Sequence, residues 1–231
     1  MSEWWTYTLS DFLMFSPRTY YRLLLRHNAE VWPAQLVAAG AGVALVALLR
    51  GNSRAQVRAT SLVLGLLWAW VGWAFLWRRY ATINPAAAYG AVAFAVQAIL
   101  LIRLATGTAG SRYQVTRSVG GAFGLSLLAV GLALYPALAP LSGRSWRGAE
   151  LFGIAPDPTA IATLGLVLLL PGRARWDLLA VPVLWCSVSA ATLWAMGSYG
   201  AIVPALSTLL ALAAATSRHP ALALPGPAPE N

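Results

Sequence analysis

Charged residues are scarce in this sequence, and their scarcity excludes an ordinary soluble domain. Only 10% of the 231 residues are charged, whereas a soluble domain carries about 25%. Apolar residues make up 59% of the chain, and the few charges lie in short stretches between long apolar runs. Such a chain lacks the polar surface that keeps a protein dissolved, so we predict a membrane protein.

Residues that bind metals or form disulfides are also few. Cys186 is the only cysteine, and the two histidines, His27 and His219, both lie outside the apolar runs. These counts exclude a disulfide within the chain, a cysteine-based metal site and a haem held by two intramembrane histidines. We therefore expect neither a metal nor another cofactor.

The sequence shows no arrangement of residues that is typical of catalysis. None of the seven acidic residues lies in the middle of an apolar run, whereas proton-coupled pumps usually carry such groups. We find no nucleotide-binding loop and no Ser–His–Asp or metal-ligand spacing. We expect no enzymatic activity, and a general base in the bundle would have to be Asp157, at its edge.

All sixteen basic residues are arginine, and the chain has no lysine. Together with the abundance of alanine, this bias is typical of a GC-rich genome and favours a bacterial source. The formal net charge is +9, but the arginines lie at the ends of apolar runs, where they contact lipid headgroups. We expect contacts with the lipid bilayer and no binding of nucleic acid.

Seven apolar runs follow one another along residues 31–216. A run of about 18 apolar residues crosses a hydrocarbon core of about 30 Å as a helix. We predict an all-α, polytopic transmembrane helix bundle of about seven spans. The fifth run is short and the last two are separated by only three residues, so a six-span alternative stays open. The predicted spans are 31–49, 59–77, 86–104, 119–138, 158–170, 178–196 and 200–216.

Two polar segments flank the apolar runs. Ser16 and Pro17 are typical of a helix start, with serine as N-cap and proline in the first helical position. We predict that residues 1–30 form an interfacial amphipathic segment that contacts lipid headgroups or, alternatively, a partner. Residues 217–231 contain four prolines, which predicts a disordered tail. One face of the amphipathic helix carries Arg18, Arg22 and Arg26.

Three of the odd-numbered spans open on a proline, at Trp32-Pro33, Asn84-Pro85 and Asp157-Pro158. Alternation of the spans puts these three helix starts on the same side of the membrane. One interpretation is structural, because capping residues satisfy the free N–H groups of a helix start near lipid. The other is that the helix N-termini converge into a polar pocket, as in transporters. The residues that would line this pocket are Arg78, Arg79, Asn84, Asp157 and Thr159.

An aromatic stripe runs along the second span, at Trp70, Trp73 and Trp77. It could stack on a quinone, a pigment or a lipid, but we favour packing in the bundle together with an interfacial belt, since Trp77 lies at the end of the span.

Small residues indicate close contacts between helices. Gly120 and Gly124 are four residues apart in the fourth span. Gln97, midway along the third span, is expected to form a hydrogen bond across the bundle. A second set of small residues in the sixth span comprises Ser187, Ala191 and Ala195.

Several motifs occur in an order that resembles a bacterial family of small multi-pass membrane proteins, catalogued as a domain of unknown function. The similarity extends over most of the chain and implies the fold and the membrane location, but no activity. The family often has cysteine between the two prolines of its last motif, where this chain has Asp157, and this departure weakens any thiol or metal role that the resemblance would imply. The motifs are Glu30-Val31-Trp32-Pro33-Ala34-Gln35, Ile83-Asn84-Pro85-Ala86-Ala87 and Pro156-Asp157-Pro158-Thr159.

Three functional hypotheses follow. The first is a non-enzymatic protein of the bacterial inner (cytoplasmic) membrane, acting as an accessory or scaffolding subunit with other membrane subunits as partners. The alternative is a small-solute or ion transporter with its site around Asn84 and Asp157. The third is a membrane enzyme acting on lipid-soluble substrates, which requires Asp157 in a buried cleft.

Overall fold

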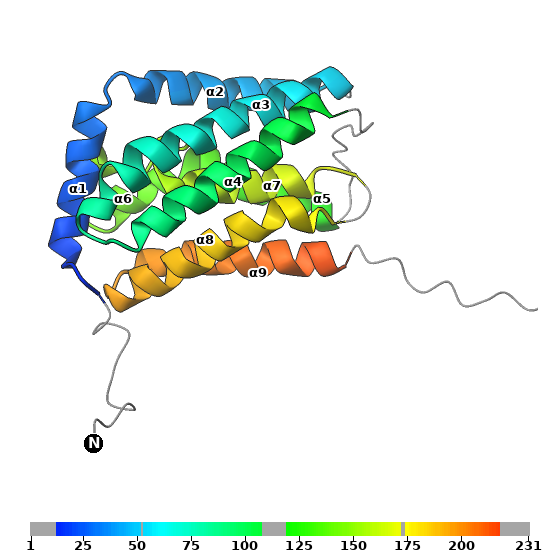
Figure 1. Cartoon of the computed structure of the whole chain (residues 1–231). Helices are drawn as coiled ribbons and strands as arrows, with labels where there is room; N and C mark the ends of the chain where they lie inside the picture. The colour runs from blue at the N-terminus through cyan, green and yellow to red at the C-terminus, as the bar shows by residue number, and fades with distance from the viewer. Residues whose placement is uncertain (1–12, 52, 108–118, 172–173, 218–231) are drawn as a thin grey trace, which may run out of the picture.

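A computed structural model describes residues 13–51, 53–107, 119–171 and 174–217, and these residues are all-helical (Figure 1). This confirms the predicted all-α class. The predicted tail lies outside the described residues, apart from Ser217. The α-helices are α1 (Pro17–Glu30), α2 (Ala34–Leu49), α3 (Arg54–Val71), α4 (Ala87–Thr106), α5 (Val119–Ala129), α6 (Leu138–Leu141), α7 (Pro156–Leu168), α8 (Trp176–Ala195) and α9 (Ile202–Thr216).

Five helical stretches in the described residues are long and apolar enough to cross a membrane. Helices α1 and α2 together give a sixth candidate, but they are bent by 88°. The predicted number of about seven spans is not confirmed, because α2 has only 16 residues and α7 only 13. The five stretches are Arg54–Thr82, Ala87–Thr106, Gly120–Leu141, Trp176–Ala195 and Tyr199–Thr216.

Two of these stretches contain a π-helix. Helix α3 continues into η3 (Gly72–Trp77), and α5 continues into η5 (Val130–Leu134). A π-helix widens the turn by one residue and changes the direction of the side chains that follow it. The π-helices are followed by the 3₁₀ turns η4 (Tyr80–Thr82) and η6 (Tyr135–Ala137).

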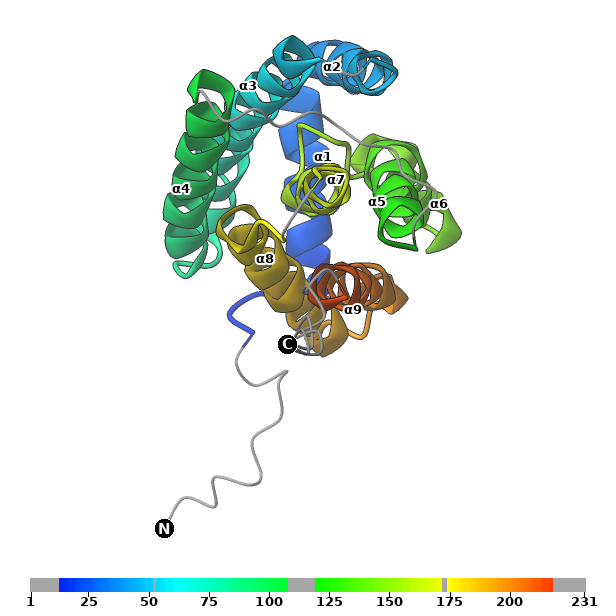
Figure 2. The same ribbon diagram turned by 90° about the vertical axis from the view of Figure 1, so that its right-hand side faces the viewer.

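Helix α7 is the centre of the bundle. Figure 2, which looks along the bundle, shows α3, α4, α8, α9 and α5 around it, and α2 at the rim beside α3. All 13 residues of α7 are buried. Apart from Asp157, Thr159 and Thr163, α7 consists of proline, glycine and apolar residues, as expected of a helix enclosed on all sides.

Close approach of α5 to α7 depends on glycine. A Cβ atom on Gly165 would lie 2.5 Å from the carbonyl oxygen of Gly124 and 2.7 Å from the backbone nitrogen of Leu128. The predicted close contact at Gly124 is therefore confirmed. The prediction for the second set of small residues is wrong within this chain, because Ser187 and Ala191 are exposed on the outer face of α8.

Buried polar side chains connect neighbouring helices. The side-chain amide of Gln97 on α4 donates a hydrogen bond of 3.0 Å to the carbonyl oxygen of Leu178 on α8, which confirms the predicted bond across the bundle. The indole N–H of Trp68 on α3 donates to the hydroxyl oxygen of Thr163 on α7 at 2.8 Å. These bonds fix the rotation of otherwise apolar helices.

Helix α1 lies across one end of the bundle (Figure 1). Its start is as predicted, since the Ser16 side chain accepts a hydrogen bond from the Thr19 N–H and Pro17 occupies the first turn. The buried ring of His27 forms a hydrogen bond with the carbonyl oxygen of Ile154. The side chain of Asn28 donates to two carbonyl oxygens of the segment before α7. Helix α1 is thus held against the start of α7, and its Arg18, Arg22 and Arg26 stay exposed.

Candidate functional site

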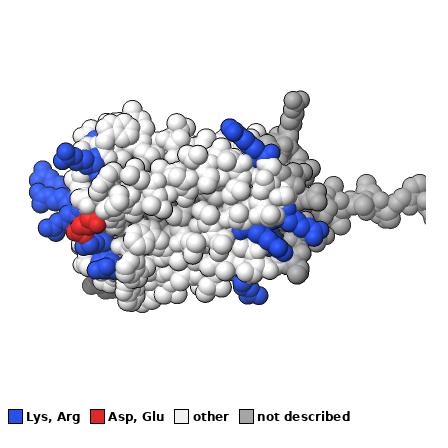
Figure 3. All heavy atoms as spheres, turned by 90° about the horizontal axis from the view of Figure 1, so that it is seen from above, with Lys and Arg blue, Asp and Glu red and all other residues white. Residues whose placement is uncertain are grey.

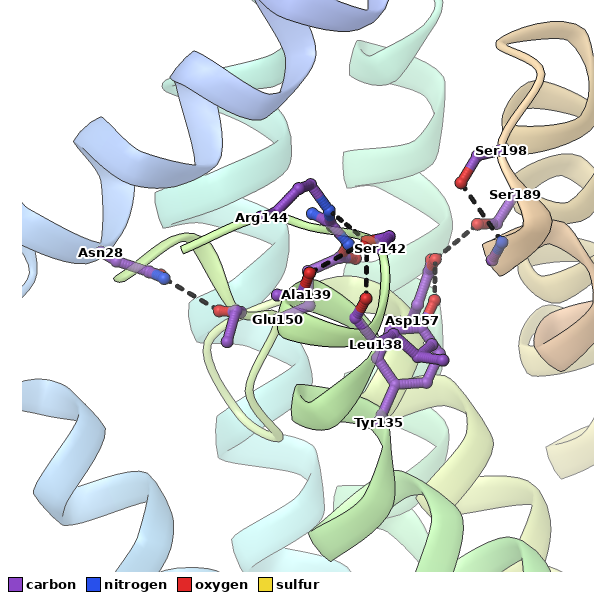
Figure 4. A network of polar contacts seen from close by, with 12 residues as sticks. Asn28, Tyr135, Leu138, Ala139, Ser142, Arg144, Glu150, Asp157, Ser189 and Ser198 are labelled. Carbon is purple, nitrogen blue, oxygen red and sulfur yellow. Dashed lines mark hydrogen bonds and ion pairs between the residues drawn. The ribbon is translucent and has the colours of Figure 1, made fainter. Parts of the chain in front are cut away.

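A buried carboxylate, that of Asp157, accepts three side-chain hydrogen bonds at the start of α7. The side chain is only 1% exposed. The hydroxyl groups of Tyr135 and Ser189 donate to Oδ2 at 2.7 and 2.6 Å, as Figure 4 shows. The indole N–H of Trp185 donates to Oδ1 at 2.7 Å. Hydrogen bonds of this kind to a charged group offset the free-energy cost of removing it from water.

The backbone around Asp157 explains how the donors reach it. Pro156 occupies the first turn of α7, and the positive end of the helix dipole favours a carboxylate in that turn. Trp185 and Ser189 lie one turn apart on the same face of α8. Tyr135 directly follows the π-helix η5, whose Gly131 has no room for a Cβ atom beside the backbone of α7.

A second carboxyl group, that of Glu150, is buried in the segment between α6 and α7. It is 4% exposed, and within the described part of the chain its Oε2 has no hydrogen-bond partner. The nearest cation is the Arg144 guanidinium, with Nη1 at 3.9 Å from Oε1. Burial, and secondarily the charge of Asp157, raises the pKa of Glu150 to about 8. Two carboxyl groups therefore influence each other near the end of the bundle that α1 covers.

Replacing Glu150 with glutamine is expected to flatten the pH dependence of stability between pH 7 and 8. In this window folded Glu150 holds a proton that the unfolded chain has released, so the wild type loses stability as pH rises, by about 1 kcal/mol per pH unit. His27 has the opposite shift, since burial lowers its pKa from 6.5 to about 4. Above pH 7 its imidazole is mainly neutral in the folded and the unfolded state, and what remains of its contribution is the same in the wild type and in the Glu150 variant.

Thermal unfolding in detergent at several pH values measures this effect. The matched control is Glu30→Gln, because Glu30 is half-exposed and pairs with Arg79. The control should keep the wild-type slope. An equal slope in Glu150→Gln and the wild type would contradict the assignment of the proton to Glu150.

A cavity of about 310 Å³ lies between α4 and α8, beside this carboxylate. Its mouth is lined by exposed residues, including Tyr89, which is 80% exposed, and by Leu184 and Val188. Trp185 and Ser189, both donors to Asp157, form part of its wall. Most of the lining is apolar, and the polar side chains in it are those of Tyr20, Tyr80, Asn84, Tyr89, Trp185, Ser189 and Thr192.

The residues of the predicted polar pocket divide among three places. Asn84 lines the cavity and Asp157 lies behind its wall, so these two are close to one site. The hydroxyl group of Thr159 donates to the carbonyl oxygen of Ala155 and accepts from the Gly153 N–H, which makes it part of the turn before α7. Arg78 and Arg79 line a separate groove beside α1.

The predicted tryptophan stripe faces outward. Trp70 is half-buried, whereas Trp73 and Trp77 are 51% and 56% exposed. The rings of Trp70 and Trp73 lie 5.6 Å apart between centroids, and the Arg78 guanidinium lies over the Trp73 ring. Packing inside the bundle therefore does not explain Trp73 and Trp77.

Sequence reasoning missed four residues of this site, namely Tyr135, Glu150, Trp185 and Ser189. The spacing of Trp185 and Ser189, one helical turn apart in a predicted span, is the signal that could have indicated a polar contact. In the part of the chain that the structure describes, no three His, Cys, Asp or Glu side chains are grouped as a metal site. The cavity is instead suited to an organic ligand, since it is concave and mainly apolar with a few polar groups.

Comparison with known proteins gives a family but no characterised relative. No curated protein and no solved structure matches the chain. One family matches from residue 18 in α1 to residue 222, beyond the end of α9, a region that includes the cavity and both buried carboxyl groups. This confirms the resemblance to a domain of unknown function that the sequence motifs indicate. The chain therefore belongs to the family of unknown function DUF6064, which matches its residues 18–222.

Proposed function

We propose that this chain is a non-enzymatic, multi-pass membrane protein that binds a small amphiphilic molecule in the cavity between α4 and α8. The observation that carries the proposal is the position of the cavity, which opens on the side of the bundle between two helices long enough to span a membrane. A molecule dissolved in the bilayer reaches such an opening without passing through water.

The distribution of charge supports an orientation in which the long helices cross the bilayer. On the face seen in Figure 3, basic residues gather at the two ends of the molecule, and an uncharged band separates them. Charged side chains at both ends and an apolar band between them are typical of a membrane-spanning bundle. Helix α1, which is bent by 88° from α2, then lies in the headgroup layer with its exposed arginines toward phosphates. The arginine bias favours a bacterial inner membrane.

The lining of the cavity suits a ligand with an apolar body and a polar end. Val181, Leu184 and Val188 offer apolar contacts, and Asn84 and Ser189 offer hydrogen bonds. The Ser189 hydroxyl group already donates to Asp157, so its oxygen is free to accept from a ligand. Asp157 acts as a positioning residue, because its carboxylate holds Ser189 and Trp185 in the wall of the cavity. We thus propose only the ligand-binding step of the transporter hypothesis.

Filling the cavity is expected to weaken binding. Ala93 lines the cavity on α4, and Ala93→Phe should weaken retention of a bound molecule by about tenfold or more. The matched control is Val96→Phe, one turn further on the same helix and outside the cavity lining. Mass spectrometry of small molecules that co-purify with the full chain in mild detergent measures the retention. Equal retention in both variants, or no enriched molecule in the wild type, would contradict the proposal.

A role as an accessory subunit is a second candidate function. Ser187 and Ala191 are exposed on the outer face of α8, next to the exposed Trp194. Small residues on the outside of a membrane helix allow a second helix to approach closely. The same gentle purification tests this role, since it requires another membrane protein in constant ratio with the chain. A chain that runs alone, with only lipid attached, would exclude it.

A further inference from the structure

A groove of about 600 Å³ between α1 and the end of the α3 span is lined by four arginines from two elements. Arg22 and Arg26 come from α1, and Arg78 and Arg79 follow η3. We call it the arginine groove. Its remaining lining is Thr19, Leu23, Leu25, Thr82 and Ile83.

The four guanidinium groups differ in their contacts with other side chains of the protein. Arg79 forms an ion pair with Glu30, and Arg78 lies over the Trp73 ring with its Cζ at 5.2 Å from the ring centroid. Arg22 and Arg26 are exposed, and among the described residues neither has an acidic partner. Two arginines are therefore held in place by the fold, and two are available to a ligand.

This arrangement fits a phosphate group. The planar guanidinium carries N–H groups in a fork that matches two phosphate oxygens at once. Within the described residues, Glu30 is the only acidic side chain that forms an ion pair with an arginine of the groove. The groove therefore keeps an excess of positive charge. Its apolar wall, formed by Leu23, Leu25 and Ile83, would contact the part of a ligand next to the phosphate.

We infer that the arginine groove binds the headgroup of an anionic membrane phospholipid. The groove lies at an end of the bundle where basic residues gather, beside the last turn of a candidate span (Figure 3). The exposed Trp77 immediately precedes Arg78, and the exposed Trp73 lies against the Arg78 guanidinium. Tryptophan is a residue type that is enriched at headgroup level in a bilayer. A phospholipid in this position places its phosphate between the arginines and its acyl chains along α3. The inference rests on the membrane-spanning orientation proposed above but is independent of the cavity.

Removal of the two available arginines is expected to weaken this binding. The test measures binding of phosphatidylglycerol and of phosphatidylcholine to the purified full chain by native mass spectrometry. Arg22→Gln with Arg26→Gln should weaken binding of phosphatidylglycerol about tenfold and leave that of phosphatidylcholine unchanged. The matched control, Arg50→Gln with Arg54→Gln, removes the same charge from exposed positions at the other end of the spans.

Three results would overturn the inference. They are wild-type affinity in the Arg22 and Arg26 double variant, an equal loss in the control, and displacement of the lipid by millimolar inorganic phosphate, which would identify a free anion as the ligand. The double variant should keep the wild-type Tm, since neither side chain supports the fold. Ala93→Phe should still bind phosphatidylglycerol, which separates failure of this site from failure of the cavity.

Discussion

Replacing Gly165 with alanine is expected to destabilise the folded protein by about 3 kcal/mol. The new methyl group would lie 2.5 Å from the carbonyl oxygen of Gly124 and 2.7 Å from the backbone nitrogen of Leu128. Both neighbours are backbone atoms, so the clash is relieved only if α5 and α7 move apart. Because α7 is packed on all sides, such a shift disturbs the whole bundle. Thermal unfolding of the purified chain in detergent measures the effect.

The matched control is Gly40→Ala in α2. A Cβ atom on Gly40 would have no neighbour within 4 Å. Since alanine favours a helix over glycine by about 1 kcal/mol, this variant should be as stable as the wild type or more so. Equal Tm values for the Gly165 and Gly40 variants would show that α5 and α7 do not pack as closely as described.

Replacing Asp157 with alanine is expected to cost about 3 kcal/mol, because it leaves the donors of Tyr135, Trp185 and Ser189 buried without their acceptor. The variant should also lose the ligand of the cavity, since two of these donors form its wall. Tm and ligand retention in mild detergent measure the two effects.

Asp177→Ala is the control for Asp157→Ala. Asp177 also lies in the first turn of its helix, but its side chain is 49% exposed and pairs with Arg175 at 2.8 Å. An exposed ion pair contributes about 1 kcal/mol or less. If both variants lost the same stability, the hydrogen bonds around Asp157 would not have the importance that we assign to them.

Some features of this protein follow from local sequence. Ser16 and Pro17 predict the start of α1, because capping depends only on neighbouring residues. Long apolar runs predict the helices that can cross a membrane, because length and composition alone decide that capacity. The glycine at position 124 predicts a close contact of α5 with another helix, but the sequence does not say that α7 is the partner.

The sequence also left some predictions incomplete. Spans defined by composition include α7, which is too short to pass the same test in the structure. Small residues at regular spacing predict a contact surface, but Ser187 and Ala191 face outward while Gly124 and Gly165 face each other. In helices that are apolar around the whole circumference, the pattern does not say which side faces the bundle.

Only the tertiary structure decided the site. The donors to Asp157 lie 22, 28 and 32 residues away along the chain. They meet it because α8 and η5, which Tyr135 directly follows, both pack against α7. The arginine groove likewise joins α1 to the end of the α3 span. Local sequence determined which segments form helices and where their charges lie. Which helices become neighbours depends on packing between distant segments, and that packing buried Asp157 and Glu150 and left Arg22 and Arg26 free to bind a ligand.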